Sequence, residues 1–333
     1  MTDLSVGERL ARLRNVRDLT QEQLAERASV SIDTIRRLEQ GAQRGARIST
    51  YQKLASALDI ELARLLGQPT MTRSLAPDGG IQALRAAIQM PSDLPGLEQY
   101  GVATDAPAAV ELRPVLDQAR AHYQRGEFTA LISTLPGLVM DLRATTREAE
   151  GGAEHDTAWS MAAATHVVVA DIAAQLGQID LAYAAVERAL HAASRASSDL
   201  WHSLAVSTLS LVLLRQGRWD QAYQVASRKA AEIEPRFSDG RPEAFAMFGI
   251  LLISGAVSAS LARQKESTSA KNEALALLKQ AKAAAELSGS VRVCGTSFGP
   301  ASVGMQATTV QVSLGQPDVA LRTASSVNVD ALP

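Results

Sequence analysis

The sequence predicts an all-α protein in which a small five-helix module precedes a solenoid of about five helix pairs. Aromatic residues make up only 4% of the chain while alanine is abundant, which is typical of closely packed helices rather than sheets. Glycine also recurs between apolar helical segments, at intervals of roughly 40 to 50 residues. We place the module at residues 1–67, a linker with a short helix at 68–107, and the repeat array at 108–333.

The module begins with a helix predicted over residues 5–14. Thr20 can cap the second helix, and Gln23 three residues later completes a capping box. Ser31 is a suitable cap for the third helix, and Gly41 ends it. The run from 20 to 41 therefore predicts two short helices joined by a tight turn.

Helical periodicity divides the third helix into two faces. Ile35 and Leu38 point to the core. The residues left outside are Ile32, Asp33, Arg36, Arg37 and Gln40. Arginine pairs with guanine, glutamine with adenine, and aspartate accepts from the cytosine amine, so this face suits reading of the major groove. A solvated surface helix would carry the same residue types, and composition alone leaves both interpretations open.

The spacing of this stretch resembles the XRE family of helix-turn-helix repressors, which includes the phage repressors. The matching positions are Thr20–Gln21, Leu24–Ala25, Val30–Ser31, Ile35, Leu38–Glu39 and Gly41. The resemblance covers about residues 5 to 67 and implies a lambda-repressor-like, five-helix DNA-binding domain. It places DNA contacts at Gln21, Ile32, Asp33 and Arg37, with Ser31, Thr34 and Arg36 near phosphates or bases. It also pairs Arg14 with Glu39 as a structural ion pair.

Two positions depart from the family pattern. Ser29 in the turn and Asp59 after the fourth helix stand where the family usually has glycine. Both positions are expected to need a left-handed backbone, which costs a non-glycine residue roughly 1 kcal/mol.

The rest of the module carries further basic residues. Residues 41–48 form a predicted loop with Arg44 and Arg47, which we expect to hold the DNA backbone, the alternative being a solvated loop. Ser49 is expected to cap a fourth helix, and a fifth is predicted at residues 61–66.

A short helix is predicted at 81–90 within the linker, and the sequence does not decide whether it packs on the array or on a partner chain. The predicted helix pairs that follow are 110–124 with 128–145, 154–176 with 179–196, 199–216 with 219–233, 243–263 with 268–287, and 301–314 with 318–325. These pairs resemble tetratricopeptide repeats with lengthened helices. The run Phe298–Gly299–Pro300 resembles a segment common in actinobacterial regulators that join an XRE head to such repeats. Another repeat usually follows in that family, so we expect the 333-residue sequence to be a truncated or naturally shortened form.

Stacked helix pairs leave a concave groove lined by the first helix of each pair. Counting back from the turn glycines places these residues on its wall: Arg113, Arg120, Tyr123, Asp171, Gln175, Leu211 and Arg215. Such a mixture suits a peptide or a small polar ligand, and the alternative is a groove filled by its own side chains or water. Related regulators often hold peptides with asparagines, but Asn272 and Asn328 are not predicted on the inner face, which weakens the peptide interpretation.

Several functional classes find no support in the residues. The single cysteine, Cys294, excludes a disulfide framework within the chain and fits a reducing cytoplasm. We find no secretory segment, and the apolar stretch Ile250–Leu261 is too short to cross a membrane, so no membrane span is expected. The five histidines have no metal-binding spacing, and no phosphate loop or nucleophile elbow is present. We therefore expect no enzyme activity, no cofactor and no metal.

Charge is unevenly distributed along the chain. Residues 1–67 hold 11 of the 33 basic and 9 of the 35 acidic residues, so the module is mildly positive and the remainder mildly negative. We expect a cytoplasmic transcriptional regulator, a homodimer on a near-palindromic operator, whose array binds a signalling peptide, a small molecule or a partner protein. The alternative is an interaction module whose repeats dock a partner and whose head serves assembly.

Overall fold

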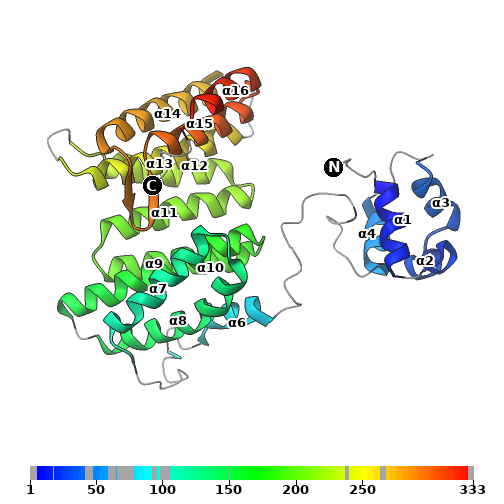
Figure 1. Cartoon of the computed structure of the whole chain (residues 1–333), viewed down its shortest axis with the longest axis horizontal. Helices are drawn as coiled ribbons and strands as arrows, with labels where there is room; N and C mark the ends of the chain where they lie inside the picture. Colours follow the sequence, from blue (N-terminus) through cyan, green and yellow to red (C-terminus); the bar gives the residue numbers. More distant parts are fainter. Residues whose placement is uncertain are drawn as a thin grey trace. The chain divides into compact units, whose positions relative to one another are not determined.

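The computed structural model describes residues 6–17, 19–41, 48–58, 65, 79–91, 96–97, 106–149, 151–236, 240–262 and 268–328. The chain divides into two compact units, Met1–Leu75 and Ala76–Pro333, which we call the head and the array (Figure 1). The described residues of both units are almost entirely helical, which confirms the predicted all-α class. The exception is one short β-hairpin in the array.

Four helices of the head are described. They are α1 (Val6–Val16), α2 (Gln21–Ala28), α3 (Ile32–Glu39) and α4 (Ile48–Ala57). Their core is a cluster of buried side chains, mostly leucines, which includes Leu10, Leu24, Ile35, Leu54 and Leu58. Leu65 belongs to the same cluster, while the rest of the predicted fifth helix and Asp59 lie outside the described residues.

The start of α4 differs from the sequence prediction. The helix begins at Ile48, so Ser49 is a residue of its first turn and not the cap that precedes it. Cap preference alone places a helix end only to within one or two residues.

Helix α1 lies unusually close to the end of α3. A methyl group added at Gly7 would lie 1.9 Å from the carbonyl oxygen of Leu38. Only a residue without a side chain allows this approach, so Gly7 determines how α1 supports α3.

The array is a stack of five helix pairs, as predicted (Figure 1). The pairs are α7 (Ala109–Gln124) with α8 (Phe128–Glu148), α9 (Gly152–Gln175) with α10 (Ile179–Arg195), α11 (Asp199–Arg215) with α12 (Trp219–Glu232), α13 (Pro242–Leu261) with α14 (Thr268–Ser288), and α15 (Pro300–Ser313) with α16 (Pro317–Ser326). In four of the pairs a glycine with positive φ reverses the chain: Gly126 at 69°, Gly177 at 74°, Gly217 at 73° and Gly315 at 71°. Glycine adopts this left-handed conformation at little cost, which is why the turns could be found from sequence.

The short helix of the linker region, α6 (Gly79–Ile88), belongs to the array. It packs against α8 and α10. Leu84 and Ile88 are fully buried there, and Arg85 forms an ion pair with Asp180 at the start of α10. The structure thus places α6 on the array, a choice that the sequence had left open.

The β-hairpin consists of β1 (Val291–Val293) and β2 (Thr296–Phe298), which pair in antiparallel register. Cys294 and Gly295 form its two-residue turn, with φ values of 50° and 81°. These strands were not predicted from the sequence, because three-residue strands are too short to show an alternating pattern.

Phe298 fixes the hairpin to the array. Its ring is 1% exposed and lies against Gly249 of α13, where an added methyl group would be 2.0 Å from the Phe298 Cζ atom. A glycine in the middle of a long helix therefore makes the space for this ring.

Helices α9 and α13 are each long and apolar enough to cross a membrane, by length and composition. From the sequence, only residues 250–261 were considered as a membrane span, whereas the helix that contains them begins at Pro242 and holds an apolar window of 18 residues. The apolar windows of the two helices are 72% and 67% buried in the structure. In the array, both are core helices whose apolar surface is covered by neighbouring helices.

Candidate functional site

The predicted capping box is present at the start of α2, and a left-handed residue ends the helix before the turn to α3. The Thr20 hydroxyl oxygen accepts from the Gln23 amide at 3.1 Å, and the Gln23 side-chain oxygen accepts from the Thr20 amide at 2.8 Å. Ser29 ends α2 in the left-handed region with φ 50° and ψ 49°. The need for such a backbone at Ser29, expected from the missing glycine, is confirmed.

The start of α3 is held in the same way. The Ser31 hydroxyl oxygen accepts from the Thr34 amide at 3.2 Å, and the hydroxyl groups of the two residues are 2.8 Å apart. Ile35 and Leu38 are 0% and 3% exposed, so the opposite face of α3 is presented to solvent. The two-faced helix that periodicity predicted is therefore present.

The outward face of α3 carries charge of both signs. Asp33, Arg36 and Arg37 are exposed, while Ile32 and Thr34 are half-buried. An Arg36 guanidinium nitrogen lies 3.5 Å from a carboxylate oxygen of Glu22, and their side chains are 49% and 63% exposed, so water weakens this pair. Arg37 has no ion-pair partner among the residues that the structure describes.

A hydrogen-bonded network beneath this face ties α1, α2 and α3 together. Arg14 donates to both carboxylate oxygens of Glu39, at 2.8 and 3.0 Å, and to the Leu19 carbonyl at 2.8 Å. The paired side chains are 13% and 7% exposed, so the bond is shielded from water. The structural ion pair that the family resemblance implied is present.

Gln21 belongs to this network as well as to the predicted interface. Its side-chain amide donates to a Glu39 carboxylate oxygen at 2.6 Å. Gln21 is therefore oriented by the buried pair, and its side-chain oxygen and second amide N–H remain for contacts outside the head. Arg44 and Arg47, the two predicted backbone contacts, lie outside the described residues.

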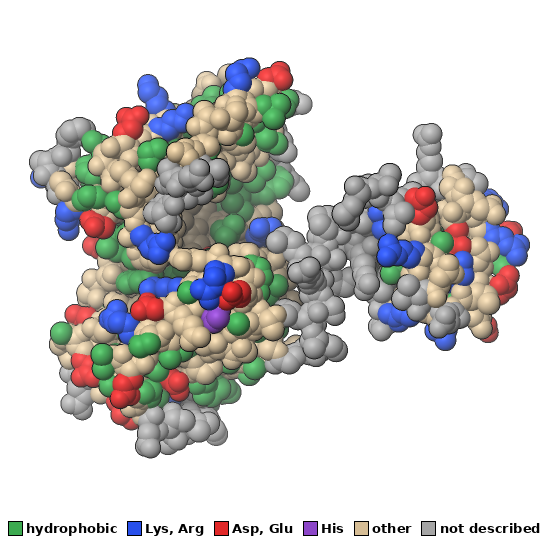
Figure 2. Space-filling view, in the orientation of Figure 1, with side chains coloured by type: hydrophobic (Ala, Val, Ile, Leu, Met, Phe, Trp, Pro, Cys, Tyr) green, Lys and Arg blue, Asp and Glu red, His purple; other side chains and the backbone are tan. Residues whose placement is uncertain are grey.

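The array contains a cavity of about 410 Å³ on the groove side. Its walls come from α7, α9, α11, α13, α15 and the hairpin, and Figure 2 shows this face of the array hollowed near its middle. Tyr123, Asp171 and Leu211 line it, and the Gln175 side-chain amide donates to the Tyr123 hydroxyl at 2.8 Å. Four of the seven predicted groove residues thus meet at one place.

The other three predicted groove residues lie elsewhere. Arg113 and Arg120 line a neighbouring cavity of about 310 Å³ between α7 and α9. Arg215 is exposed in the last turn of α11 and is not among the described residues lining either cavity.

Asp171 is the one acidic side chain among the described residues that line the groove cavity. Burial raises the pKa of its carboxyl to about 7, although a hydrogen bond with Thr208 acts in the opposite direction. Burial, and the neighbouring Asp171, also raise the pKa of the Tyr123 hydroxyl well above its usual value. Near neutral pH the Asp171 carboxyl in this cavity is therefore partly protonated.

Hydroxyl groups make up much of the remaining polar surface of the groove cavity, and they were not predicted from the sequence. The Ser207 and Ser254 hydroxyls are 2.9 Å apart, and those of Ser210 and Ser258 are 3.3 Å apart. In each of α11 and α13 the two serines are three or four residues apart within an apolar run. That spacing on an otherwise apolar helix was the signal that could have identified them.

The hairpin turn reaches α7 at the other end of the array. An added methyl group at Gly295 would lie 3.3 Å from the Arg120 side-chain Nε atom. The Arg120 guanidinium lies 5.3 Å from the centre of the Trp201 ring, and burial lowers its pKa. This contact borders the groove cavity. It links the first helix pair to the hairpin that precedes the last helix pair.

Among the described residues, no group of three or more histidine, cysteine, aspartate or glutamate side chains is placed to hold a metal ion.

Comparison with solved structures gives several distant similarities. PlcR of Bacillus thuringiensis, in complex with the peptide PapR7 and DNA, is 13% identical with a TM-score of 0.34, over 85% of this chain and 95% of that chain. A mutant of PrgX is 9% identical with a TM-score of 0.30, over 97% and 100%. The apo form of ComR from S. thermophilus is 12% identical with a TM-score of 0.29, over 98% and 96%.

No curated protein matches the sequence. A family model described as helix-turn-helix matches residues 10–65, the part of the chain that contains α2, α3 and their connecting turn. The head of this chain, over residues 10–65, is a helix-turn-helix domain of the XRE type.

Proposed function

We propose that this protein is a sequence-specific DNA-binding transcriptional regulator. The observation that carries the proposal is the exposed polar face of α3, with Asp33, Arg36 and Arg37, on a helix anchored by Ile35 and Leu38 inside a helix-turn-helix domain. Helices of this kind enter the major groove and contact base edges with their outward side chains.

The roles of the outward residues follow from their chemistry. Arg37 is suited to bidentate donation to guanine, and Asp33 to acceptance from the cytosine amine. Ile32 is placed to contact a thymine methyl group, while Ser31, Thr34 and Arg36 are suited to phosphates at the rim of the groove. Gln21, held by Glu39, adds a contact from the start of α2. Arg44 and Arg47 add charge for the DNA backbone.

A homodimer is the expected active form. An eight-residue α3 reaches only a few base pairs, so a single head binds weakly. Two heads on half-sites about one helical turn apart combine two weak contacts into one strong one, and the operator is then near-palindromic.

The array is proposed to sense a signal in the groove cavity. A volume of about 410 Å³ is within the range of roughly 300–1,000 Å³ that small-molecule sites occupy. Tyr123, Asp171 and the paired serines offer both donors and acceptors, which suits a short peptide segment or a small polar molecule. We assign no cofactor, metal, membrane or catalytic role, and we place the protein in the cytoplasm, where its DNA is found.

Selection of bound fragments from a random DNA pool tests the proposal. A regulator enriches a motif with two-fold symmetry, because each head reads one half-site. The competing function is an interaction module whose head serves assembly, since the groove cavity also suits a partner protein. Recovery of random sequences alone, at a salt concentration where the protein still binds DNA, would favour that alternative.

A further inference from the structure

The groove cavity has a single charged side chain, Asp171, in its described lining. The other described residues there are apolar or carry hydroxyl or amide groups, and Tyr123 is the one further titratable group. Asp171 forms a hydrogen bond with Thr208 and no ion pair with any residue that the structure describes. Burial of a charge is costly unless an opposite charge or several hydrogen bonds compensate it. The carboxylate therefore needs a partner that the described part of the chain does not supply.

The Asp171 carboxyl is held between three helices. The next residue of α9, Ile172, is fully buried, which fixes the helix at this point. Gln175, one turn further along the same face of α9, donates to the Tyr123 hydroxyl of α7 at 2.8 Å, and Thr208 comes from α11. A carboxylate has about four acceptor positions, so the bond with Thr208 leaves others for a donor inside the cavity.

The serines of the cavity offer acceptors rather than donors. The Ser210 hydroxyl donates to the Ala222 carbonyl at 3.0 Å, and the Ser254 hydroxyl donates to the Ile250 carbonyl at 3.1 Å. The Ser207 hydroxyl has the oxygen of Ser254 as its acceptor at 2.9 Å. These hydroxyl protons are used within the protein, while oxygen lone pairs remain for a ligand. The cavity therefore favours a ligand that donates hydrogen bonds.

Much of the remaining lining is apolar and extends over two neighbouring helices. It includes Leu204, Leu211 and Leu214 of α11 and Ile250, Ile253 and Val257 of α13. The apolar surface of a ligand is stabilised when it leaves water for such a wall. The cavity thus combines one anionic group with an extended apolar surface.

We propose that the groove cavity binds a small organic cation, a protonated amine on an apolar body, with its nitrogen at Asp171 and its body against α11 and α13. This inference rests on the sensor role proposed above and names the class of ligand for it. An ammonium group has three N–H donors and no acceptor, which matches a lining of one carboxylate and several serine oxygens. Its hydrogen bonds to a carboxylate are charge-assisted and are stronger than bonds between neutral groups.

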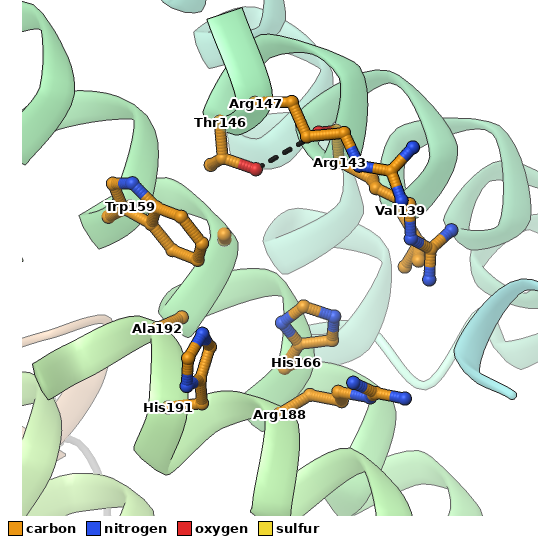
Figure 3. A pocket seen from close by; sticks show the side chains of 10 residues that line it. Val139, Arg143, Thr146, Arg147, Trp159, His166, Arg188, His191 and Ala192 are labelled. Atoms are coloured by element: carbon orange, nitrogen blue, oxygen red, sulfur yellow. Dashed lines mark hydrogen bonds between the residues drawn. The ribbon is translucent and has the colours of Figure 1, made fainter. Parts of the chain in front are cut away.

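A further cavity of the array differs in charge (Figure 3). It measures about 190 Å³ and lies between α8, α9 and α10, and its described lining holds three arginines and two histidines but no acidic side chain. One of the arginines, Arg143, donates to the Ala87 carbonyl of α6 at 2.6 Å. An ammonium group finds no carboxylate acceptor in this lining. Of these two cavities, the groove cavity is therefore the one that suits a cation.

The test is calorimetric titration of the full chain with 2-phenylethylamine, at ionic strength held constant with sodium chloride. The comparison ligand is 2-phenylethanol, which has the same apolar body and a hydroxyl group in place of the ammonium group. We expect saturable binding of the amine at one site, about 10- to 100-fold tighter than binding of the alcohol, because a hydrogen bond to a charged group is added. This comparison uses the wild-type chain alone, so it does not depend on the folding of a variant.

Asp171→Asn removes the charge with little change of shape. It should weaken binding of the amine about 10- to 100-fold and change binding of the alcohol by no more than about twofold, since only the amine uses the charge. The matched control is Asp220→Asn at an exposed position in the first turn of α12, which should bind both ligands as the wild type does.

The affinity for the amine should rise from pH 6 to pH 8. The pKa of Asp171 is raised to about 7 by burial, and the ionised carboxylate attracts the cation. The amine stays protonated in this range, and the Tyr123 hydroxyl stays neutral because its pKa is raised. The affinity of Asp171→Asn should be the same at both pH values.

The phenylalanyl-leucine amide dipeptide separates the two sources of an ammonium group. Tighter binding of 2-phenylethylamine would identify a small amine, and tighter binding of the dipeptide would identify the amino terminus of a peptide. Absence of saturable amine binding, equal affinity for amine and alcohol, or an amine affinity unchanged by Asp171→Asn would each overturn the inference. A two-fold DNA motif without amine binding would overturn this inference alone. Amine binding without an enriched motif would overturn the regulator and leave the amine site standing.

Discussion

Replacement of Gly7 by alanine is a direct test of how the head holds its recognition helix. The new methyl group would lie 1.9 Å from the Leu38 carbonyl oxygen, whereas real contacts of this kind are essentially never shorter than 3.0 Å. Helices α1 and α3 must therefore move apart, and the atom in the way is backbone that cannot rotate aside. The shift displaces α3, whose other face carries the predicted base contacts.

The expected cost combines two opposing effects. Overpacking of a tight contact costs about 1–3 kcal/mol, and a backbone obstacle places this case at the upper end. Alanine in place of glycine within a helix stabilises the helix by up to about 1 kcal/mol. We therefore expect Gly7→Ala to lower the free energy of unfolding of the head by about 1–2 kcal/mol.

The assay must report on the head alone. All three tryptophans, Trp159, Trp201 and Trp219, lie in the array, so their fluorescence follows the array and should not change. Amide hydrogen exchange of α1 and α3 follows the head, and it should become several-fold faster.

Gly137→Ala in α8 is the matched control, because no atom lies within 4 Å of its added methyl group. That variant should instead stabilise the array by up to about 1 kcal/mol. Exchange in α1 and α3 that is unchanged or slower in Gly7→Ala would refute the close contact.

Two further variants test the array. The pKa of Asp171 is raised from 3.8 to about 7, so the folded state binds more protons than the unfolded state between these values, and stability should fall as pH rises through this window. At about 1.4 kcal/mol per pKa unit, the free energy of unfolding should fall by at most about 4 kcal/mol, and by less because Asp171 is only partly buried. Urea unfolding at pH 5 and pH 8 measures this pH dependence, and Asp171→Asn should abolish it. Gly249→Ala places a methyl group 2.0 Å from the Phe298 Cζ atom, so we expect about 1–3 kcal/mol of destabilisation, a lower Tm and faster exchange in the hairpin. A Tm equal to that of the wild type would show that the ring moves aside without cost.

Much of the fold was predictable because local signals determine it. Glycines 126, 177, 217 and 315 occupy left-handed turns that few other residues tolerate, so each marks the end of a helix. Thr20 and Ser31 form the cap hydrogen bonds that their types predict. The hairpin was not predictable, since the ring of Phe298 is accommodated by Gly249, about fifty residues earlier in the chain.

In the candidate sites as well, features set by the local sequence were predictable, and features set by contacts between helices were not. The outward face of α3 depends on helical period, and Asp33, Arg36 and Arg37 are exposed as predicted. The bond from Gln21 to Glu39 crosses between helices, and spacing along the chain does not reveal it. In the groove, counting back from turn glycines located Tyr123 and Asp171, but the curvature of the stack decides whether a residue such as Arg215 faces a cavity.

Direct reading of DNA by α3 is tested most directly by measuring how Arg37→Ala changes the affinity for the selected operator and for each single-base variant of it. Arg12→Ala, exposed on α1, is the control for general loss of positive charge. If Arg37 contacts a guanine, its removal should cost about 1–3 kcal/mol on the operator and abolish discrimination at one base pair per half-site, leaving random DNA nearly unaffected. Equal losses on operator and random DNA, with discrimination intact at every position, would contradict base reading by this face.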